Sequence, residues 1–133
     1  MMTTKPQKQR ILVVDDNPKG ASAMQKLLER SGYEVETADS GESALATAQN
    51  GVFDVIILDI QLPDMNGYEV AHRLRNTQNF RKLLIALTGY YGRDEDKLLA
   101  QDAGFDYYLT RPVLVDDIKK LFTDYFTRGS VLP

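Results

Sequence analysis

The chain of 133 residues contains no cysteine. This absence excludes disulfide bonds, thiol catalysis and cysteine-rich metal sites, and it agrees with a reducing compartment. Long apolar stretches are missing as well, because runs such as VIIL at residues 55–58 are far too short to span a membrane. We therefore expect a cytoplasmic protein that does not insert into a membrane.

Neither sign of charge dominates the composition. Lysine and arginine number 16 against 19 aspartates and glutamates, a net charge of −3, which does not indicate nucleic-acid binding. The start, MMTTKPQKQR, lacks the apolar stretch of a signal peptide. The length suits one compact domain. We expect a flexible lead-in over residues 1–9, one domain over residues 10–127 and a tail over residues 128–133.

Short apolar runs alternate with helical patterns along the chain. The runs at 10–14, 54–58 and 83–87 are continuous, as in strands buried on both faces, and further runs lie at 33–38 and 107–109. Between the runs, apolar residues recur at intervals of three and four, as in amphipathic helices. This alternation predicts an α/β protein with a flavodoxin-like, doubly wound (βα)5 fold. Such a fold is a three-layer sandwich around a parallel five-stranded sheet in the order 2-1-3-4-5.

Start and stop signals bound several of the predicted helices. Pro18 suits the first turn of a helix that Gly32 ends. Ser40 is a candidate N-cap for the next helix, and Gly104 follows a helix over roughly residues 93–103. The last helix carries an apolar stripe at the spacing i, i+3, i+4 and i+7: Ile118, Leu121, Phe122 and Tyr125.

Three acids lie where buried strands end. Asp15 and Asp16 come directly after the first strand, and Asp59 comes after the third. Ligands of doubly wound sheets bind outside the carboxyl ends of the strands, at the point where the strand order reverses, and here that point lies between strands one and three. We therefore expect the three carboxylates to converge. A plainer interpretation, that each is a turn or cap residue, suits any one of them better than all three together.

Crowded carboxylates repel one another, and a hard divalent cation relieves that repulsion. Mg²⁺ prefers oxygen ligands, keeps several waters and is commonly held by one or two carboxylates together with a phosphate. Thr88 follows the fourth strand, and Arg111 follows the fifth after Thr110. Because arginine is always charged, we expect Arg111 to face the acids. The spacing thus predicts a Mg²⁺ site that handles a phosphoryl group.

At this point the sequence resembles the receiver domains of two-component response regulators, over about residues 10 to 126. The motifs that carry the resemblance are LVVDDN at 12–17, VIILDIQLPDMNGYEV at 55–70, ALTGY at 86–90, AGFDYYL at 103–109 and Pro112. Together these motifs are highly specific, whereas the DD pair alone is weak.

The resemblance implies a role for each acid. Asp59 is expected to be the phosphoacceptor, which takes a phosphoryl group from a phosphohistidine and becomes an aspartyl phosphate. Asp16 and Asp59 are expected to ligate Mg²⁺ directly, together with the backbone carbonyl of Gln61. Asp15 is expected to hold a metal-bound water.

The resemblance also implies a switch. Thr88 is expected to donate its hydroxyl to a phosphoryl oxygen, and Tyr108 to turn inward as Thr88 moves. The family has a lysine before the proline, where this chain has Arg111, and a guanidinium is bulkier and binds oxyanions through a fork. We expect Arg111 to face Asp59 and the Arg111–Pro112 peptide bond to be cis, as the family's usually is.

The expected function is a signalling switch and not an enzyme, beyond self-catalysed phosphoryl transfer to Asp59 and its dephosphorylation. Its expected partners are a sensor histidine kinase or a histidine phosphotransfer protein, and an unidentified downstream protein. No direct binding of nucleic acid is expected. The protein is expected to be a monomer or weak dimer. One alternative is a receiver-like interaction module whose switching Arg111 has weakened or abolished. Another is a phosphohydrolase of the haloacid-dehalogenase type, but such enzymes carry D-x-D after the first strand, and this chain has adjacent aspartates there.

Overall fold

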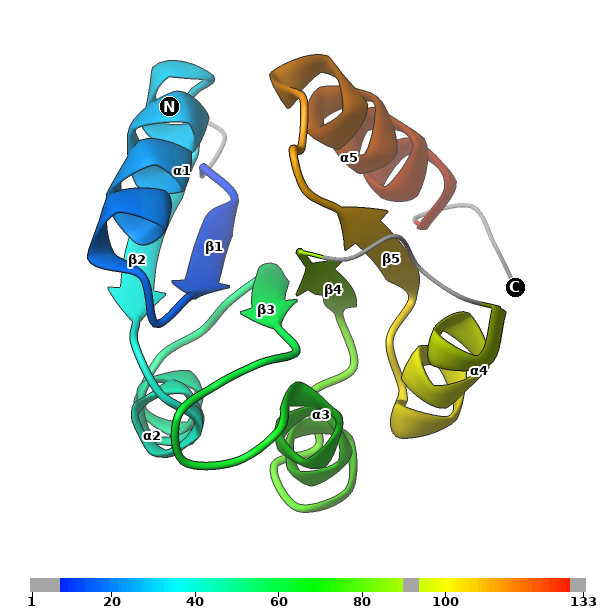
Figure 1. Cartoon of the computed structure of the whole chain (residues 1–133). Coiled ribbons are helices and arrows are strands. Elements are labelled where there is room, and N and C mark those ends of the chain that lie inside the picture. The colour runs from blue at the N-terminus through cyan, green and yellow to red at the C-terminus, as the bar shows by residue number, and fades with distance from the viewer. Residues whose placement is uncertain (1–7, 90–93, 130–133) are drawn as a thin grey trace, which may run out of the picture.

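The computed structural model describes residues 8–89 and 94–129. Five strands alternate with five helices along this part of the chain (Figure 1). Their bounds are β1 Arg10–Val14, α1 Pro18–Arg30, β2 Glu34–Ala38, α2 Gly41–Asn50, β3 Val55–Asp59, α3 Gly67–Asn76, β4 Leu83–Thr88, α4 Asp94–Ala103, β5 Tyr107–Thr110 and α5 Val115–Gly129. Within the described residues, no helix combines the length and the apolar character that crossing a membrane requires.

The strands form one parallel sheet in the order β2-β1-β3-β4-β5, which confirms the predicted fold class. The chain leaves β1 toward β2 on one side and returns to place β3 on the other. The strand order therefore reverses between β1 and β3, and this is where a doubly wound sheet leaves room for a ligand.

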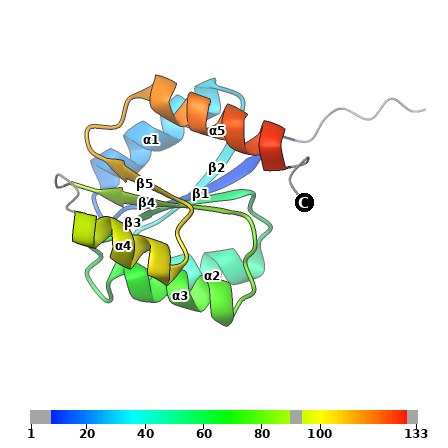
Figure 2. The same ribbon diagram turned by 90° about the vertical axis from the view of Figure 1, so that its right-hand side faces the viewer.

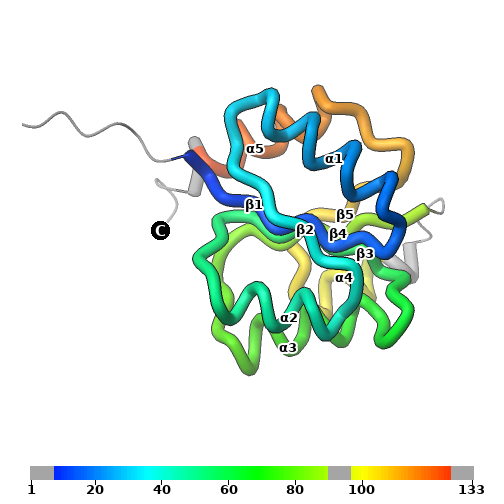
Figure 3. The backbone as a smooth tube through the Cα atoms, turned by 90° about the vertical axis from the view of Figure 1, so that its left-hand side faces the viewer, coloured from blue at the N-terminus to red at the C-terminus, as the bar shows by residue number. Residues whose placement is uncertain are grey.

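Helices cover both faces of the sheet. Helices α1 and α5 lie on one face and α2, α3 and α4 on the other (Figures 2 and 3). Each face has its own buried cluster, because side chains alternate between faces along a strand. Ile11, Val13 and Phe122 belong to the cluster beneath α1 and α5. Leu12 and Val70 belong to the cluster beneath the other three helices.

The predicted helix boundaries agree with the structure where residues are described. Pro18 is the first residue of α1, and Gly32 after it has a φ of 97°, a conformation that glycine adopts without steric cost. Ser40 caps α2 and accepts from the backbone N–H of Ser43. Gly104, with a φ of 107°, follows α4, whose first residue in the structure is Asp94.

Two residues expected just beyond strands are the last residues of those strands. Asp59 pairs with Leu87 in the ladder between β3 and β4, and Thr88 pairs with Thr110 between β4 and β5. Both strands end one residue later than the apolar runs, because backbone pairing continues after the side chains become polar. The backbone of both candidate residues is consequently fixed by the sheet.

Candidate functional site

Asp15, Asp16 and Asp59 converge at the carboxyl ends of β1 and β3. One carboxylate oxygen from each lies within 4.8 Å of the others. Asp15 and Asp59 are buried, with 4% and 5% of their surface exposed, whereas Asp16 is exposed. With Gln61 and Arg111, these acids line a cavity of about 330 Å³ that opens to solvent. The convergence expected from the sequence is therefore present.

Backbone groups orient the two buried carboxylates. The N–H of Asn17 donates to Asp15 Oδ1 at 2.9 Å, and the N–H of Gln61 donates to Asp59 Oδ1 at 2.9 Å. Gly20, in the first turn of α1, lies so close that a Cβ there would be 2.7 Å from Asp15 Oδ2. A glycine at this point allows α1 to start directly over the acid.

Arg111 faces the acids, but its shorter contact is with Asp15. Its Nη2 donates to Asp15 Oδ2 at 2.7 Å, while Nη1 reaches Asp59 Oδ2 only at 3.5 Å. The backbone N–H of Arg111 donates to the carbonyl of Thr88 at 2.7 Å, which anchors the start of the β5–α5 loop to β4. The Arg111–Pro112 peptide bond is cis, as predicted.

The sequence indicated Asp59 as the partner of Arg111, and the preference for Asp15 was not foreseen. The fork of the guanidinium allows Arg111 to contact both acids, because each of its two terminal nitrogens can bind a different carboxylate. The side chain of Arg111 is 34% exposed, so it lies along the rim of the cavity.

Burial raises the pKa of Asp59, because desolvation disfavours the charged carboxylate. The N–H of Gln61 and the positive charge of Arg111 act in the opposite direction, and the neighbouring acids Asp15 and Asp16 raise the pKa further. Asp59 is thus a carboxylate whose negative charge is only partly compensated by the protein, as suits a group that binds a cation.

Thr88 and Tyr108 lie on one face of the sheet. Tyr108 pairs with Ala86 in the ladder, and Thr88 is two residues after Ala86, so their side chains point to the same side. Tyr108 is half-buried and packs against the cluster beneath α2, α3 and α4, and Thr88 is 6% exposed. The structure thus places the two residues predicted to switch on neighbouring strands.

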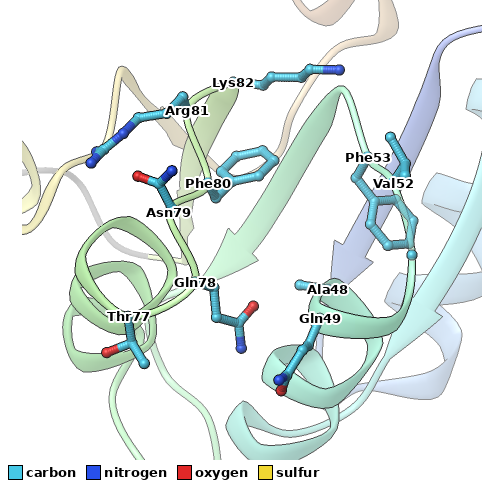
Figure 4. A pocket seen from close by; sticks show the side chains of 11 residues that line it. Ala48, Gln49, Val52, Phe53, Thr77, Gln78, Asn79, Phe80, Arg81 and Lys82 are labelled. Carbon is cyan, nitrogen blue, oxygen red and sulfur yellow. The ribbon is translucent and has the colours of Figure 1, made fainter.

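A second cavity, of about 610 Å³, lies at the opposite end of the sheet between the α2–β3 and α3–β4 loops (Figure 4). Its walls include Phe53, Phe80, Gln78, Arg81 and Lys82. No carboxylate or imidazole is among its described lining residues. It therefore lacks the cluster of carboxylates that lines the acid cavity.

Comparison with known protein families assigns a family to the chain that carries the acid cavity. The model of the response regulator receiver domain matches residues 11–123. The chain belongs to the response regulator receiver domain family. Receiver domains are signalling modules and not classical enzymes, and this assignment takes the place of the phosphohydrolase alternative.

Curated relatives and solved structures agree with the family. The transcriptional regulatory protein TcrA of Mycobacterium tuberculosis is 37% identical over 122 residues, which cover 92% of this chain and 47% of TcrA. Hybrid signal transduction histidine kinase L of Dictyostelium discoideum is 34% identical over 128 residues, covering 91% of this chain and 7% of the kinase. This receiver therefore spans less than half the length of either relative.

The structural match extends over nearly the whole receiver. A CheY-like response regulator receiver domain from Methanospirillum hungatei superposes with a TM-score of 0.86 at 30% sequence identity, covering 96% of this chain and 100% of that one.

Sequence reasoning did not single out Asn17 and Gly20 as part of the site. Asn17 binds Asp15 through its backbone, and its side chain caps α1 by accepting from the N–H of Lys19. A signal was available, because Asn17 and Pro18 together mark a helix start directly after the two acids, and Gly20 lies in that helix's first turn.

His72 is exposed on α3, as expected for a lone helical histidine. Tyr90 and Tyr91, which follow Thr88 and Gly89 in the sequence and could therefore cover the site, lie outside the described residues.

Proposed function

We propose that this receiver accepts a phosphoryl group on Asp59 with the help of Mg²⁺. The observation that carries the proposal is the cluster of one buried nucleophilic carboxylate, two further acids within 4.8 Å and a cation, Arg111. A carboxylate is a competent nucleophile for phosphoryl transfer, which otherwise requires positioning and charge neutralisation.

The donor set fits magnesium. All the candidate ligands are oxygens, which Mg²⁺ prefers, and the cavity opens to solvent on one side, so that bound waters can complete its shell. Asp16 and Asp59 would bind the ion directly with the carbonyl of Gln61, and Asp15 would hold one of its waters. When bound, the ion neutralises charge on the phosphoryl oxygens.

The residues of the chain then have distinct tasks. An Asp59 oxygen forms the new P–O bond while the P–N bond to the donor imidazole breaks, and the electron pair stays on the imidazole nitrogen, which takes up a proton from water. The N–H of Gln61 holds the other Asp59 oxygen and so orients the nucleophile. Thr88 and Arg111 donate to the phosphoryl oxygens, and Tyr108 follows Thr88 to signal the change.

A groove beside the acid cavity suits the phosphohistidine-bearing partner. Met24, Leu27, Pro112 and Val113 line it, and it shares Arg111 with the acid cavity. A partner docked here brings its imidazole next to Asp59. The similarity of this chain to a segment of a hybrid signal transduction histidine kinase supports a histidine-kinase system as its source of phosphoryl groups. Leu27→Asp should slow transfer from a phosphorylated histidine phosphotransfer protein and leave labelling by acetyl phosphate unchanged.

Intact-mass spectrometry after incubation with acetyl phosphate and Mg²⁺ tests the phosphorylation. Wild type should gain one phosphoryl group and Asp59→Asn none, because an amide oxygen is a poor nucleophile. Equal gains in both proteins would place the phosphoryl group on another residue. A wild type that is never labelled, by acetyl phosphate or by a kinase, would overturn the proposed function.

A further inference from the structure

The acid cluster already has a counter-ion within the chain. Among the residues that the structure describes, Arg111 is the only basic side chain that lines the acid cavity, and its two terminal nitrogens each contact a different buried acid. The acids carry three negative charges and Arg111 one positive charge, so a net charge of −2 is left for a divalent cation to balance.

Every oxygen of the two buried carboxylates has a partner. The N–H groups of Asn17 and Gln61 bind one oxygen of Asp15 and of Asp59, and Arg111 contacts the other oxygen of each. Only Asp16 makes no hydrogen bond or ion pair with the described part of the chain. A cation that enters this cavity therefore meets one carboxylate without a partner in the described part of the chain, Asp16, and two whose oxygens already accept hydrogen bonds, Asp15 and Asp59.

The two contacts of Arg111 are unequal. The 2.7 Å contact with Asp15 is that of a short charge-assisted hydrogen bond, whereas 3.5 Å to Asp59 lies at the limit of hydrogen bonding. Asp15 is also the more restrained acid, since Gly20 packs directly against the oxygen that Arg111 binds. The ion pair that opposes cation binding is thus the one with Asp15.

We propose that Arg111 sets the divalent-cation affinity of this receiver, because a cation binds fully only as the guanidinium releases Asp15. The inference rests on the acid cluster being the cation site of the proposed function. Release also frees Nη2 to turn toward Asp59, where the phosphoryl group arrives. Cation binding and the approach of Arg111 to the phosphoryl oxygens are therefore coupled through Asp15.

A lysine at this position would compete less. An ammonium is one compact, strongly hydrated charge, whereas the guanidinium is weakly hydrated and binds each acid through its own nitrogen. Arg111→Lys keeps the charge near the cation and removes the fork. This variant therefore distinguishes two causes of weak Mg²⁺ binding: a guanidinium that holds Asp15, and long-range repulsion between two positive charges.

The test measures magnesium affinity from amide NMR shifts at residues 15–17 and 59–61. Arg111→Lys and Arg111→Ala should each bind Mg²⁺ about two- to fivefold tighter than wild type, as expected for the loss of one partly exposed ion pair. Arg73→Lys is the matched control, because Arg73 pairs with Glu69 on the exposed face of α3. The Mg²⁺ affinity of this variant should equal that of wild type. The dispersion of the amide spectrum verifies that each variant is folded.

A second variant identifies the acid involved. In an Asp15→Asn background, Arg111→Lys should change the magnesium affinity by less than twofold, since the charge that held the guanidinium is gone. In wild type, the guanidinium ¹⁵N signals of Arg111 should shift on adding Mg²⁺, which reports the release directly.

The outcomes are distinct. If Arg111→Lys binds Mg²⁺ like wild type, the guanidinium does not hold Asp15 against the cation, and the inference is wrong even where Arg111→Ala binds tighter. An unchanged Arg111→Lys effect in the Asp15→Asn background would also overturn it. If neither wild type nor any variant shows shifts around residues 15–16 and 59–61, the cation site of the proposed function is itself wrong.

Discussion

Arg75, near the end of α3, donates through Nη2 to Asp106 Oδ2 at 2.9 Å, in the turn before β5. The same side chain donates to the backbone carbonyls of Gly104, Phe80 and Lys82. Asp106 in turn accepts from the N–H of Leu84, the second residue of β4. A single guanidinium thus joins α3, the start of β4 and the α4–β5 turn.

Arg75→Ala should lower the free energy of unfolding by about 2–3 kcal/mol, because hydrogen bonds to charged groups contribute more than neutral ones and three carbonyls lose their donor. The side chain is only 13% exposed, so water cannot fully replace it. Urea denaturation measures the change.

Arg73→Ala is the control for this measurement. Arg73 makes one exposed i,i+4 pair with Glu69, and its loss should cost no more than about 0.5 kcal/mol. Equal effects of the two substitutions would show that the network around Arg75 adds nothing to stability.

Asp64 links the β3–α3 loop to α2. Its carboxylate accepts from the N–H groups of Gly41 and Glu42, both at 2.8 Å, and these hydrogen bonds lower the pKa of Asp64. A lowered pKa means that the carboxylate stabilises the fold above the unfolded-state pKa, about 3.9, and that this contribution is lost as the pH falls through the folded-state pKa.

Asp64→Ala should therefore be less stable than wild type at pH 7, and the difference should shrink in strong acid. Thermal denaturation at several pH values measures it. Asp102→Ala, which removes an exposed acid of α4 without a hydrogen-bond partner among the described residues, should show no such pH dependence. A deficit of Asp64→Ala that stays constant down to the lowest pH would contradict the role of the charge.

Local signals made the elements predictable from the sequence. The continuous run at residues 10–14 predicted a buried strand, and Pro18, Gly32 and Ser40 predicted helix ends, because each acts through its own backbone or its nearest neighbours. The convergence of the acids was predictable too, since parallel strands of a doubly wound sheet end at one edge. The family resemblance supplied the cis bond before Pro112.

Contacts between distant segments were not predictable in the same way. No role for Asp64 was predicted from the sequence, because its two hydrogen bonds to α2 depend on how the β3–α3 loop folds back over that helix. Arg75 was not singled out either, because its partners follow it by as many as 31 residues. The expected contact of Arg111 with Asp59 is present at 3.5 Å, but the shorter contact with Asp15 was not predicted. A difference of less than 1 Å between two contacts depends on side-chain geometry that sequence spacing does not specify.

Asp59→Asn should stabilise the protein at neutral pH in the absence of Mg²⁺. Burial raises the pKa of Asp59, so its contribution is fully favourable below the unfolded-state pKa and is lost as the pH rises through the folded-state pKa. The ionised carboxylate at pH 7 is therefore a cost that asparagine removes, and Arg111 keeps its shorter contact with Asp15.

Melting curves in a chelator, from neutral pH down to below about 3.9, check this expectation. The gain of Asp59→Asn should be present at pH 7 and vanish once aspartate is protonated in both states. A gain that is the same at every pH would point to packing and not to charge, and no gain at pH 7 would contradict the desolvation argument.

Gly67 and Gly89 should respond differently to substitution by alanine. A Cβ on Gly67, the first residue of α3, would lie 2.7 Å from the carbonyl oxygen of Asp59 and 2.7 Å from Cα of Ile60. Both are backbone atoms that cannot rotate away. A Cβ on Gly89 would meet nothing within 4 Å in the described part of the chain.

Overpacking usually costs about 1–3 kcal/mol, and the gain of up to about 1 kcal/mol in helix propensity that alanine brings offsets only part of that cost. Gly67→Ala should therefore lower the free energy of unfolding by up to about 2 kcal/mol. It should also weaken Mg²⁺ binding, because relief of the clash moves the backbone of residues 59–61, which carries Asp59 and the Gln61 carbonyl. Gly89→Ala should stay within about 0.5 kcal/mol of wild type. Urea denaturation measures the stability of both variants, and magnesium titration measures their Mg²⁺ affinity. If Gly67→Ala matches wild type in both, the β3–α3 loop accommodates the added methyl group without disturbing the site, and the prediction is wrong.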